Sequence, residues 1–282
     1  MKIKITGDSS CDLGEELIKK FNFSILPMHI TLGDKEYKDA RELNQDEFYK
    51  FLKTNKALPR TSACNTEESL EFFKSELSKD GGYDALIHFT ISSKISSTYQ
   101  NAVLASQDCD NKVFVVDSLS LSTGVGLQML YCADLVAQGL DASEVFEKVL
   151  ARRDKVQASF VIDKLTYLHK GGRCSAVAKW AAGLLSIKPV IGLKDGSMQV
   201  DSKLIGKYEK IVPKYVDYIL RTHPDIDRKY CFITHTPVEN GVVKAVREQI
   251  KTKFDNIIET EAGCTIATHC GPNTLGILYY KK

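Results

Sequence analysis

The first half of the chain alternates short β-rich runs with segments of helical spacing. Strands are predicted at residues 2–6, 85–90 and 113–117, and a helical pattern follows each of them. Alternation of this kind is typical of parallel sheets, in which helices cross from one strand to the next over both faces. The first half is therefore predicted to form an α/β domain with a parallel sheet.

The second half mixes hairpin signals with helical patterns. Residues 189–193 and 198–200 are predicted as strands that are joined by a Lys-Asp-Gly turn. The run 265–268 is predicted as an apolar strand that ends at His269, and residues 275–280 form a further strand after a Gly-Pro turn. These features predict a smaller α+β domain with a mixed sheet.

Length and composition limit the classes of protein to which the chain can belong. A chain of 282 residues exceeds the usual size of one domain, so we expect two domains, residues 1–155 and 156–282. The content of 43% hydrophobic and 26% charged residues is ordinary for a folded, soluble protein. The formal net charge of +2 gives no electrostatic case for binding nucleic acid or an acidic membrane surface.

The expected location is the cytoplasm. The N-terminus reads directly as a strand without the apolar segment of a signal peptide, and the longest apolar runs are too short to span a membrane. The eight cysteines form no C-x-x-C pair and are expected to be reduced thiols. Cys264, His269 and Cys270 have poor spacing for a metal site, so we expect neither a metal nor a cofactor.

Four segments rich in serine and threonine are expected at one edge of the predicted sheet. They are Gly7-Asp8-Ser9-Ser10, Arg60-Thr61-Ser62, residues 90–99 and Asp117-Ser118-Leu119-Ser120. Ligands of open α/β sheets bind outside the carboxyl ends of the strands, where hydroxyl and free N–H groups can bind a carboxylate or phosphate. Each segment alone is more typical of helix caps and turns, but four at one edge together indicate a binding site.

Two further segments carry groups suited to an anion. His269 lies beside a Gly-Pro turn, and its imidazole can donate a hydrogen bond or exchange a proton. In Gly171-Gly172-Arg173, the glycines allow close approach of the backbone and the guanidinium offers a permanent charge. No phosphate loop is present, and Gly124-Val-Gly126 lies within a predicted helix, so nucleotide binding by this chain is not predicted.

Taken in order, these motifs resemble those of the DegV family. Residues 7–13 are similar to the family's opening Thr-Asp-Ser-Thr-x-Asp-Leu, and residues 92–100 to its Ser-Ser-x-Leu-Ser-Gly-Thr-Tyr-Gln. The other matches follow in the family's order: Thr61-Ser62, Asp117-Ser118, Gly124-Val-Gly126, Gly171-Gly172-Arg173, Lys188-Pro189, Asp195-Gly196 and His269-Cys270-Gly271-Pro272. Each motif is unspecific by itself, whereas the ordered set spans nearly the whole chain.

The resemblance implies a two-domain DegV-like (EDD-type) architecture that holds a long-chain fatty acid in a tunnel between the domains. The carboxylate would be bound by Thr61, Ser62, Ser93 and His269, and Arg173 would lie near the head group to assist phosphate transfer or partner docking. The family includes the FakB subunits of bacterial fatty acid kinase, in which a separate ATP-binding subunit phosphorylates the bound acid. The chain would then be a lipid-binding carrier rather than an enzyme.

Apolar residues near these motifs are the candidates for the tunnel wall, with an ordinary core position as the alternative for each. They are Phe89, Ile91, Ile95, Leu165, Leu168, Trp180, Leu184, Ile187 and Ile277. Burial of an acyl chain contributes about 0.8 kcal/mol per methylene, so an apolar tunnel gives tight binding with few polar contacts. The carboxylate needs hydrogen-bond donors once it leaves water.

The chain departs from the family pattern at several positions. Gly7 replaces a threonine, Lys94 and Ser97 stand where glycine is common, and Ala267 and Asn273 replace glycines near His269. Asn273 can keep a turn because asparagine tolerates a positive φ. Lys94 either adds a cation near the head group or points into solvent.

Two other functions remain open on the sequence. One is a hydrolase that acts on a lipid-like ester, with Ser93 or Ser62 as nucleophile, His269 as base and Asp8 or Asp117 as orienting group. No Gly-x-Ser-x-Gly turn supports it. The other is a binder of a different amphiphilic acid, such as a retinoid or a sterol-like acid.

Overall fold

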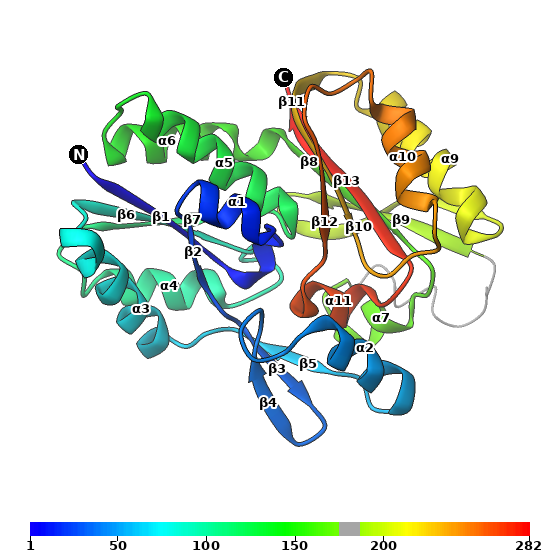
Figure 1. Ribbon diagram of the computed structural model, residues 1–282, viewed down its shortest axis with the longest axis horizontal. Coiled ribbons are helices and arrows are strands. Elements are labelled where there is room, and N and C mark those ends of the chain that lie inside the picture. Colours follow the sequence, from blue (N-terminus) through cyan, green and yellow to red (C-terminus); the bar gives the residue numbers. More distant parts are fainter. Residues whose placement is uncertain (175–186) are drawn as a thin grey trace. The chain divides into compact units, whose positions relative to one another are not determined.

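Four parallel strands form the first sheet of the computed structural model, which describes residues 1–174 and 187–282 (Figure 1). Their order in the sheet is β2 (Ser24–Leu26), β1 (Ile3–Asp8), β6 (Ala85–Thr90) and β7 (Val113–Asp117). Each neighbouring pair is parallel. The parallel sheet predicted from the alternating pattern is therefore confirmed.

Helices cover both faces of this sheet (Figure 1). On one face, α3 (Thr66–Ser78) and α4 (Thr98–Ser106) pack together over a core that includes Phe73 and Leu86. On the other face, α5 (Thr123–Ala137) and α6 (Ala142–Arg152) pack against the strands and against each other. The burial of these apolar stripes is the main force that holds the layers together.

Side-chain caps fix the start of several helices. Asn44 accepts a hydrogen bond from Glu47 N at the start of α2 (Gln45–Thr54), as expected for an asparagine that precedes an amphipathic helical pattern. Asn65 caps α3, and Asp141 caps α6, and each makes a reciprocal capping box with a glutamate three residues on. A cap of this kind stabilises a helix by about 1 kcal/mol, because it satisfies backbone N–H groups that have no partner within the helix.

A separate antiparallel sheet of three strands follows β2 in the chain. Its order is β4 (Lys35–Lys38), β3 (His29–Leu32) and β5 (Arg60–Ser62). The turn at Gly33 and Asp34 joins β3 to β4, as expected for a Gly-Asp pair between two β-rich runs. The pairing of β5 with β3 was not predicted, because a run of three residues carries too little pattern to identify a strand.

The second half of the chain forms a mixed sheet of six strands. The order is β10 (Ser197–Ile205), β9 (Ile187–Lys194), β8 (Val156–Ile162), β13 (Thr274–Lys281), β11 (Ile226–His235) and β12 (Ile257–Glu261). Only the β11–β12 pair is parallel among the pairs in this described sheet. The expected mixed sheet is confirmed.

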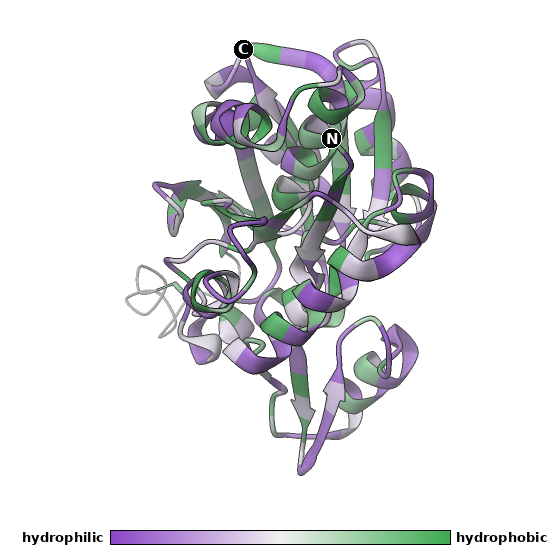
Figure 2. Ribbon diagram, turned by 90° about the vertical axis from the view of Figure 1, so that its left-hand side faces the viewer, coloured by the Kyte–Doolittle hydropathy of each residue, from purple (hydrophilic) through white to green (hydrophobic). Residues whose placement is uncertain are grey.

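Two amphipathic helices, α9 (Tyr208–Thr222) and α10 (Val242–Ile250), supply most of the core on one face of this sheet. Tyr215 is fully buried there, and its hydroxyl donates to Ser159 O (2.8 Å) while it accepts from Ile277 N (3.0 Å). A buried hydroxyl with both kinds of partner avoids the penalty of an unsatisfied polar group. In Figure 2, the helices of the protein show both hydrophobic and hydrophilic residues along their length, as helices with one buried face should.

The segment that was predicted as a strand before His269 is a helix. Helix α11 runs over Cys264–Cys270, so the prediction of a strand at 265–268 was wrong. Residues 264–268 are all buried. A short apolar run that is buried on every side has no period, so the sequence does not distinguish a helix from a strand there.

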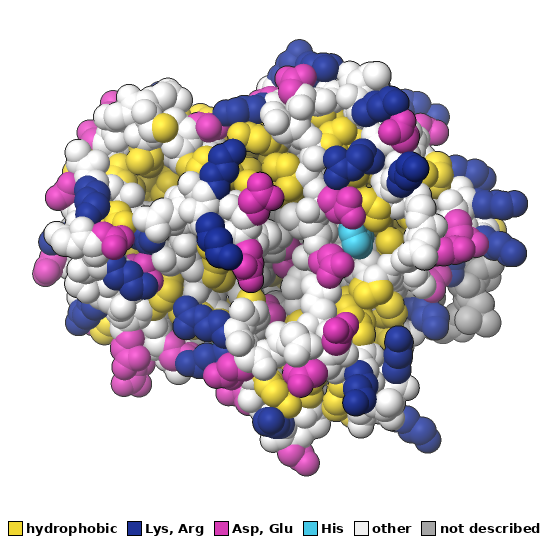
Figure 3. Space-filling model, viewed as in Figure 1, with side chains coloured by type: hydrophobic (Ala, Val, Ile, Leu, Met, Phe, Trp, Pro, Cys, Tyr) yellow, Lys and Arg dark blue, Asp and Glu magenta, His cyan; other side chains and the backbone are white. Residues whose placement is uncertain are grey.

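The contacts within the chain divide it into two compact units. Unit 1 comprises Met1–Asp154 and Gly263–Thr265, and unit 2 comprises Lys155–Ala262 and Ile266–Lys282. The short elements η1 (Ser9–Cys11) and α1 (Glu15–Lys20) belong to unit 1. Lysine and arginine side chains are interspersed with acidic ones on the face drawn in Figure 3, in keeping with the small net charge. Within the described residues, every helix is too short or too polar to cross a membrane.

Candidate functional site

Three neighbouring strands of unit 1 end at one edge of the parallel sheet, and a serine-rich loop follows each of them. β1 leads into η1, β6 into residues 91–97, and β7 into residues 118–122. Because the three strands are parallel and adjacent, their carboxyl ends lie together. This is the edge at which open α/β sheets bind ligands.

Two aspartates at strand ends hold these loops through the backbone. Asp8, the last residue of β1, accepts hydrogen bonds from Ile91 N (2.8 Å) and Ser10 N (3.0 Å). Asp117, the last residue of β7, accepts from Ser93 N (3.0 Å) and Leu119 N (3.1 Å). Both carboxylates therefore position loops through their backbone N–H groups.

Ser93 is half-buried in the loop that these bonds fix. The Asp117 carboxylate accepts a hydrogen bond from the backbone N–H of Ser93 and not from its hydroxyl. The preceding residue is also anchored, since Ser92 N donates to Ser120 O (2.9 Å). A serine in a loop held from two sides can present its hydroxyl to a ligand at little additional loss of conformational entropy.

Burial changes the acidity of Asp8. The side chain is fully buried, and desolvation raises the pKa of its carboxyl to about 6, against the opposing effect of the hydrogen bonds from Ser10 and Ile91. The Ser10 hydroxyl also donates to this carboxylate. Asp8 thus changes charge close to neutral pH while it supports the loop that carries Ser93.

Thr61 and Ser62 do not belong to the edge of the parallel sheet. They lie in β5, where Thr61 pairs with Ile30 and Ser62 pairs with His29 of β3. The expectation that all four serine- and threonine-rich segments share one sheet edge is wrong for this segment, because its partner is the β3–β4 hairpin. Thr61 is half-buried and Ser62 is exposed.

A second pair of buried aspartates holds residues 263–265 within unit 1. Asp12 accepts hydrogen bonds from Gly263 N (2.9 Å) and the Ser122 hydroxyl (2.5 Å). Asp39 accepts from the Ser9 hydroxyl (2.9 Å) and, more weakly, from Thr265 N (3.4 Å). Burial raises the pKa of both carboxyls.

Sequence reasoning assigned no role to Asp12 or Asp39. One signal was present for Asp12, which stands between the apolar residues Cys11 and Leu13. An acidic residue in such surroundings is rarely buried without partners. The partners themselves lie up to 251 positions away in the chain, so local patterns did not reveal them.

His269 lies in the last turn of α11, in unit 2. Gly271 follows the helix with a φ of +71°, and its N–H donates to Ala267 O (2.8 Å). This is the left-handed turn that often ends helices, and glycine adopts it without strain. The turn after His269 was correctly expected, although it follows a helix rather than a strand.

Helix α7 (Thr166–Gly171) and α11 approach each other closely at two glycines, Gly171 at the end of α7 and Gly271 directly after α11. A Cβ atom on Gly171 would lie 2.4 Å from His269 Nδ1, and one on Gly271 would lie 2.2 Å from the Tyr167 ring. Both distances are far below van der Waals contact. The His269 ring therefore packs against the backbone at Gly171, and the Tyr167 ring packs against the backbone at Gly271. Any other residue at these two positions would place a side chain where the ring lies.

Arg173 lies next to this contact and donates to Gly171 O (2.7 Å). Burial lowers the pKa of His269 to about 4, and the positive charge of Arg173 adds to this effect. At neutral pH the imidazole is therefore uncharged and can donate one hydrogen bond, while the exposed guanidinium keeps its charge. A neutral donor beside a cation is a suitable arrangement for a carboxylate.

The candidate tunnel residues differ in burial. Phe89, Ile91, Leu168 and Ile277 are buried, whereas Ile95, Leu165 and Ile187 are half-buried. Ile277 belongs to the core beneath α9 and α10. Trp180 and Leu184 lie outside the described residues, and the lining role of the whole set stays a prediction.

The family model of the DegV proteins matches residues 2–282. The chain belongs to the DegV family. A DegV domain-containing protein of Caldanaerobacter subterraneus is 32% identical over 286 residues, which cover 100% of this chain and 99% of the relative. A fatty acid-binding protein of Thermotoga maritima is 30% identical over 98% of this chain and 96% of its own length.

The fold agrees with that of solved DegV structures. A DegV family protein of Thermus thermophilus, described as binding fatty acid, superposes with a TM-score of 0.91 at 26% identity and full coverage of both chains. The DegV-like architecture, with a parallel sheet in the first half and a mixed sheet in the second, is thereby confirmed.

The departures of this DegV protein from the family motifs are accommodated in two visible ways. Asn273 adopts a φ of +56°, so the turn after α11 is kept without glycine, as expected. Lys94 is exposed, in line with the solvent-facing alternative. Ala267 lies inside α11, so the prediction that it belongs to a strand was wrong. As expected, its backbone needs no positive φ.

Proposed function

We propose that this DegV protein binds a long-chain fatty acid and that Thr61, Ser62, Ser93 and His269 bind its carboxylate. The single observation that carries the proposal is its 30% identity, over nearly the full length of both chains, to the fatty acid-binding protein of Thermotoga maritima. The likeness to the Thermus thermophilus protein supports it further.

The chemistry of the residues supports this choice of ligand. Three hydroxyls and a neutral imidazole offer donors to a carboxylate, and Arg173 supplies a positive charge close to His269. A fatty acid of about sixteen carbons would gain about 0.8 kcal/mol for each buried methylene. Affinity would then come from the acyl chain, and the polar groups would select for a free acid.

We further propose that the bound acid is the substrate of a separate ATP-dependent kinase subunit. A carboxylate oxygen would attack the γ-phosphorus of ATP, so that acyl phosphate and ADP are formed. Arg173 would stabilise the charge of the transferred phosphoryl group or contact the partner. The chain itself would act as the carrier.

The first experiment is mass spectrometry of the purified protein under native and denaturing conditions, with extraction of any bound lipid. A long-chain fatty acid at near one-to-one stoichiometry is expected. Thr61→Ala, Ser93→Ala and His269→Gln should each weaken binding about tenfold or more, because each removes one hydrogen bond to a charged group. Ser97→Ala, at an exposed position of the same loop as Ser93, is the matched control.

A ligand-free protein that also fails to bind added fatty acids would contradict the proposal. Binding of a retinoid or sterol-like acid in place of a fatty acid would redirect it to another amphiphile. The kinase step is tested separately by acyl phosphate formation with the ATP-binding subunit, where Arg173→Ala should reduce turnover by more than its effect on fatty acid binding accounts for.

A further inference from the structure

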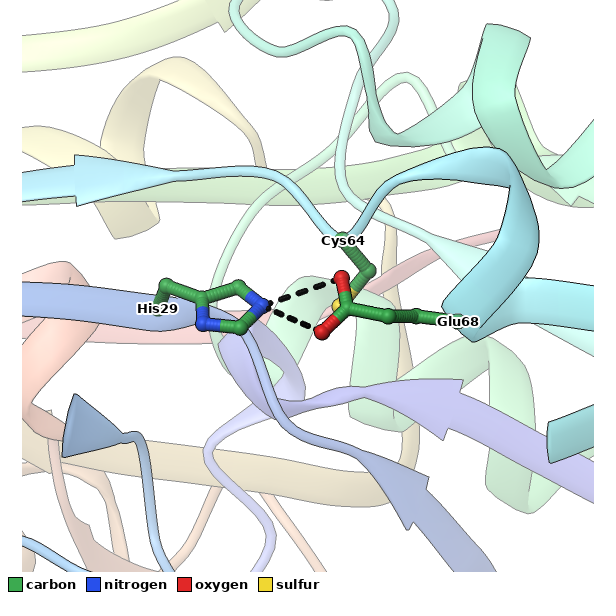
Figure 4. Close-up of side chains that lie close together, drawn as sticks. All are labelled: His29, Cys64 and Glu68. Atoms are coloured by element: carbon green, nitrogen blue, oxygen red, sulfur yellow. Dashed lines mark hydrogen bonds and ion pairs between the residues drawn. The ribbon is translucent and has the colours of Figure 1, made fainter. Parts of the chain in front are cut away.

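Three side chains with metal-binding atoms meet in unit 1. His29 begins β3, Cys64 follows β5, and Glu68 lies in the first turn of α3 (Figure 4). One ligand atom from each lies within 4.8 Å of those of the other two. His29 Nε2 lies 2.9 Å and 3.1 Å from the two carboxylate oxygens of Glu68.

The local structure holds these side chains in place before any ion arrives. The pairing of His29 with Ser62 brings the start of β3 beside the end of β5. The capping box at Asn65 fixes the Glu68 carboxylate, since Asn65 N donates to Glu68 Oε2 (3.0 Å). Ligands that are already ordered lose little entropy when they bind a metal.

A second carboxylate orients the histidine from its other side. Glu36 Oε1 of β4 lies 3.3 Å from His29 Nδ1. Metal-binding histidines nearly always have such a partner on the nitrogen that does not bind the metal, because it fixes the tautomer and makes the free nitrogen a better ligand.

We propose that His29 Nε2, Cys64 Sγ and a Glu68 carboxylate oxygen bind Zn²⁺, with water as the fourth ligand. Nitrogen, sulfur and oxygen ligands in a tetrahedral arrangement are those that zinc prefers, and thiolate with imidazole disfavours Mg²⁺ and Ca²⁺. Metal–ligand bonds of about 2.0–2.3 Å place tetrahedral ligands roughly 3.3–3.6 Å apart. Ligand atoms that now lie up to 4.8 Å apart would move closer together, and His29 Nε2 and the Glu68 oxygen 2.9 Å away would move slightly apart.

Binding requires proton release from the thiol. Cys64 is buried, its thiol donates to Pro27 O (2.9 Å), and burial raises its pKa to about 12. Zinc would displace this proton to solvent and form the thiolate bond, as metals do with thiols.

The test uses the full chain after removal of metals by a chelator, with Co²⁺ as a spectroscopic probe and Zn²⁺ competed against a colorimetric chelator. One equivalent should bind, and Co²⁺ should give the near-ultraviolet band of a thiolate bond with the visible bands of a tetrahedral site. Cys64→Ser and His29→Gln should weaken Zn²⁺ binding at least a hundredfold. Glu68→Gln and Glu36→Gln should weaken it about tenfold or more.

Matched controls are Cys109→Ser, a buried cysteine of the α3–α4 core, and Glu71→Gln, an exposed glutamate on α3. Both should bind Zn²⁺ as the wild type does. Absence of the thiolate band in the wild type, or unchanged affinity in His29→Gln and Glu68→Gln, would overturn the site and leave an ion pair. If Cys64→Ser fails to fold, these two variants and the wild-type Co²⁺ spectrum still decide the question, independently of fatty acid binding.

Discussion

The two units hold their candidate ligand-binding groups by different means. In unit 1, the buried carboxylate of Asp8 and that of Asp117 accept hydrogen bonds from loop backbone and so fix Ser93. In unit 2, Gly171 lets the backbone of α7 lie against the His269 ring. The first arrangement depends on charge and hydrogen bonds, and the second depends on the absence of a side chain. Unit 1 should therefore be sensitive to lost acceptors, and unit 2 to added volume.

The largest effect is expected from Asp8→Ala. It leaves three donors without an acceptor, namely the N–H groups of Ile91 and Ser10 and the Ser10 hydroxyl. At about 1 kcal/mol for each buried donor, the free energy of unfolding of unit 1 should fall by about 3 kcal/mol. Hydrogen exchange measured by mass spectrometry should show faster exchange in peptides that contain residues 91–97.

Asp225→Ala, at an exposed position of unit 2, is the control for this substitution. Unchanged exchange of residues 91–97 in Asp8→Ala would show that the carboxylate does not hold this loop. The contrast drawn between the units would then be lost.

Gly171→Ala should destabilise unit 2 by about 2 kcal/mol, because the new methyl group overlaps His269 Nδ1. A double-mutant cycle with His269→Ala sharpens the test. Once the ring is removed, the added methyl should cost much less, so a coupling energy of about 1 kcal/mol or more is expected from chemical unfolding. Additive effects would mean that the helix contact does not depend on the ring.

Gly172→Ala separates volume from backbone strain. Gly172 has a φ of +68° and open space around its Cβ position. Its substitution should destabilise unit 2 by about 1 kcal/mol through backbone strain alone, with no coupling to His269→Ala.

Asp8 of unit 1 and His269 of unit 2 should contribute to the pH dependence of stability with opposite signs. The raised pKa of Asp8, about 6, means that its contribution to stability is complete below its unfolded value of 3.8 and is lost as pH rises through 6. The lowered pKa of His269, about 4, means that its contribution is complete above its unfolded value of 6.5 and is lost as pH falls towards 4.

Each contribution is isolated by subtracting the variant from the wild type. Between pH 4.5 and 6, the stability difference between wild type and Asp8→Asn should fall with rising pH, and that for His269→Gln should rise, each by about 1 kcal/mol per pH unit. The subtraction removes the effect of other buried groups such as His88, whose pKa burial lowers to about 3. Two slopes of the same sign would contradict a raised pKa for Asp8 together with a lowered pKa for His269.

An effect of similar size to that of Gly172→Ala is expected in the turn after α11. Asn273→Ala places a Cβ-bearing residue without a polar side chain at a φ of +56°, which should lower stability by about 1 kcal/mol. Asn273→Gly should be neutral within about 0.5 kcal/mol, because glycine adopts this conformation freely. Equal stability of the two variants in thermal unfolding would show that the turn relaxes.

The sequence predicted best where the chain repeats a pattern over many residues. The alternation of strands and helices gave the parallel sheet, and the cap at Asn44 is a local signal that the structure confirms. Helix α11 was missed because threonine and isoleucine favour strands, whereas the packing of a short buried segment decided the outcome.

The candidate site was less accessible to sequence reasoning, because its contacts join distant parts of the chain. The serine-rich loops after β6 and β7 could be predicted, since each follows a recognisable strand. The pairing of β5 with β3 could not be predicted. Because this pairing brings His29 close to Cys64 and Glu68, their cluster could not be predicted either. Register between strands is set by the whole fold, not by the residues of either strand alone.

The position of β13 has a consequence for folding during protein synthesis. This strand lies between β8 and β11, yet it begins at Thr274, long after β8 ends at Ile162. At about 10 residues per second, the ribosome needs about ten seconds to cover that interval. The edge of β8 that β13 will cover is unpaired throughout this time, and that of β11 is unpaired from its own synthesis onward. Such edges invite pairing with other chains. We therefore expect the incomplete sheet of unit 2 to be prone to association with other chains until β13 is made.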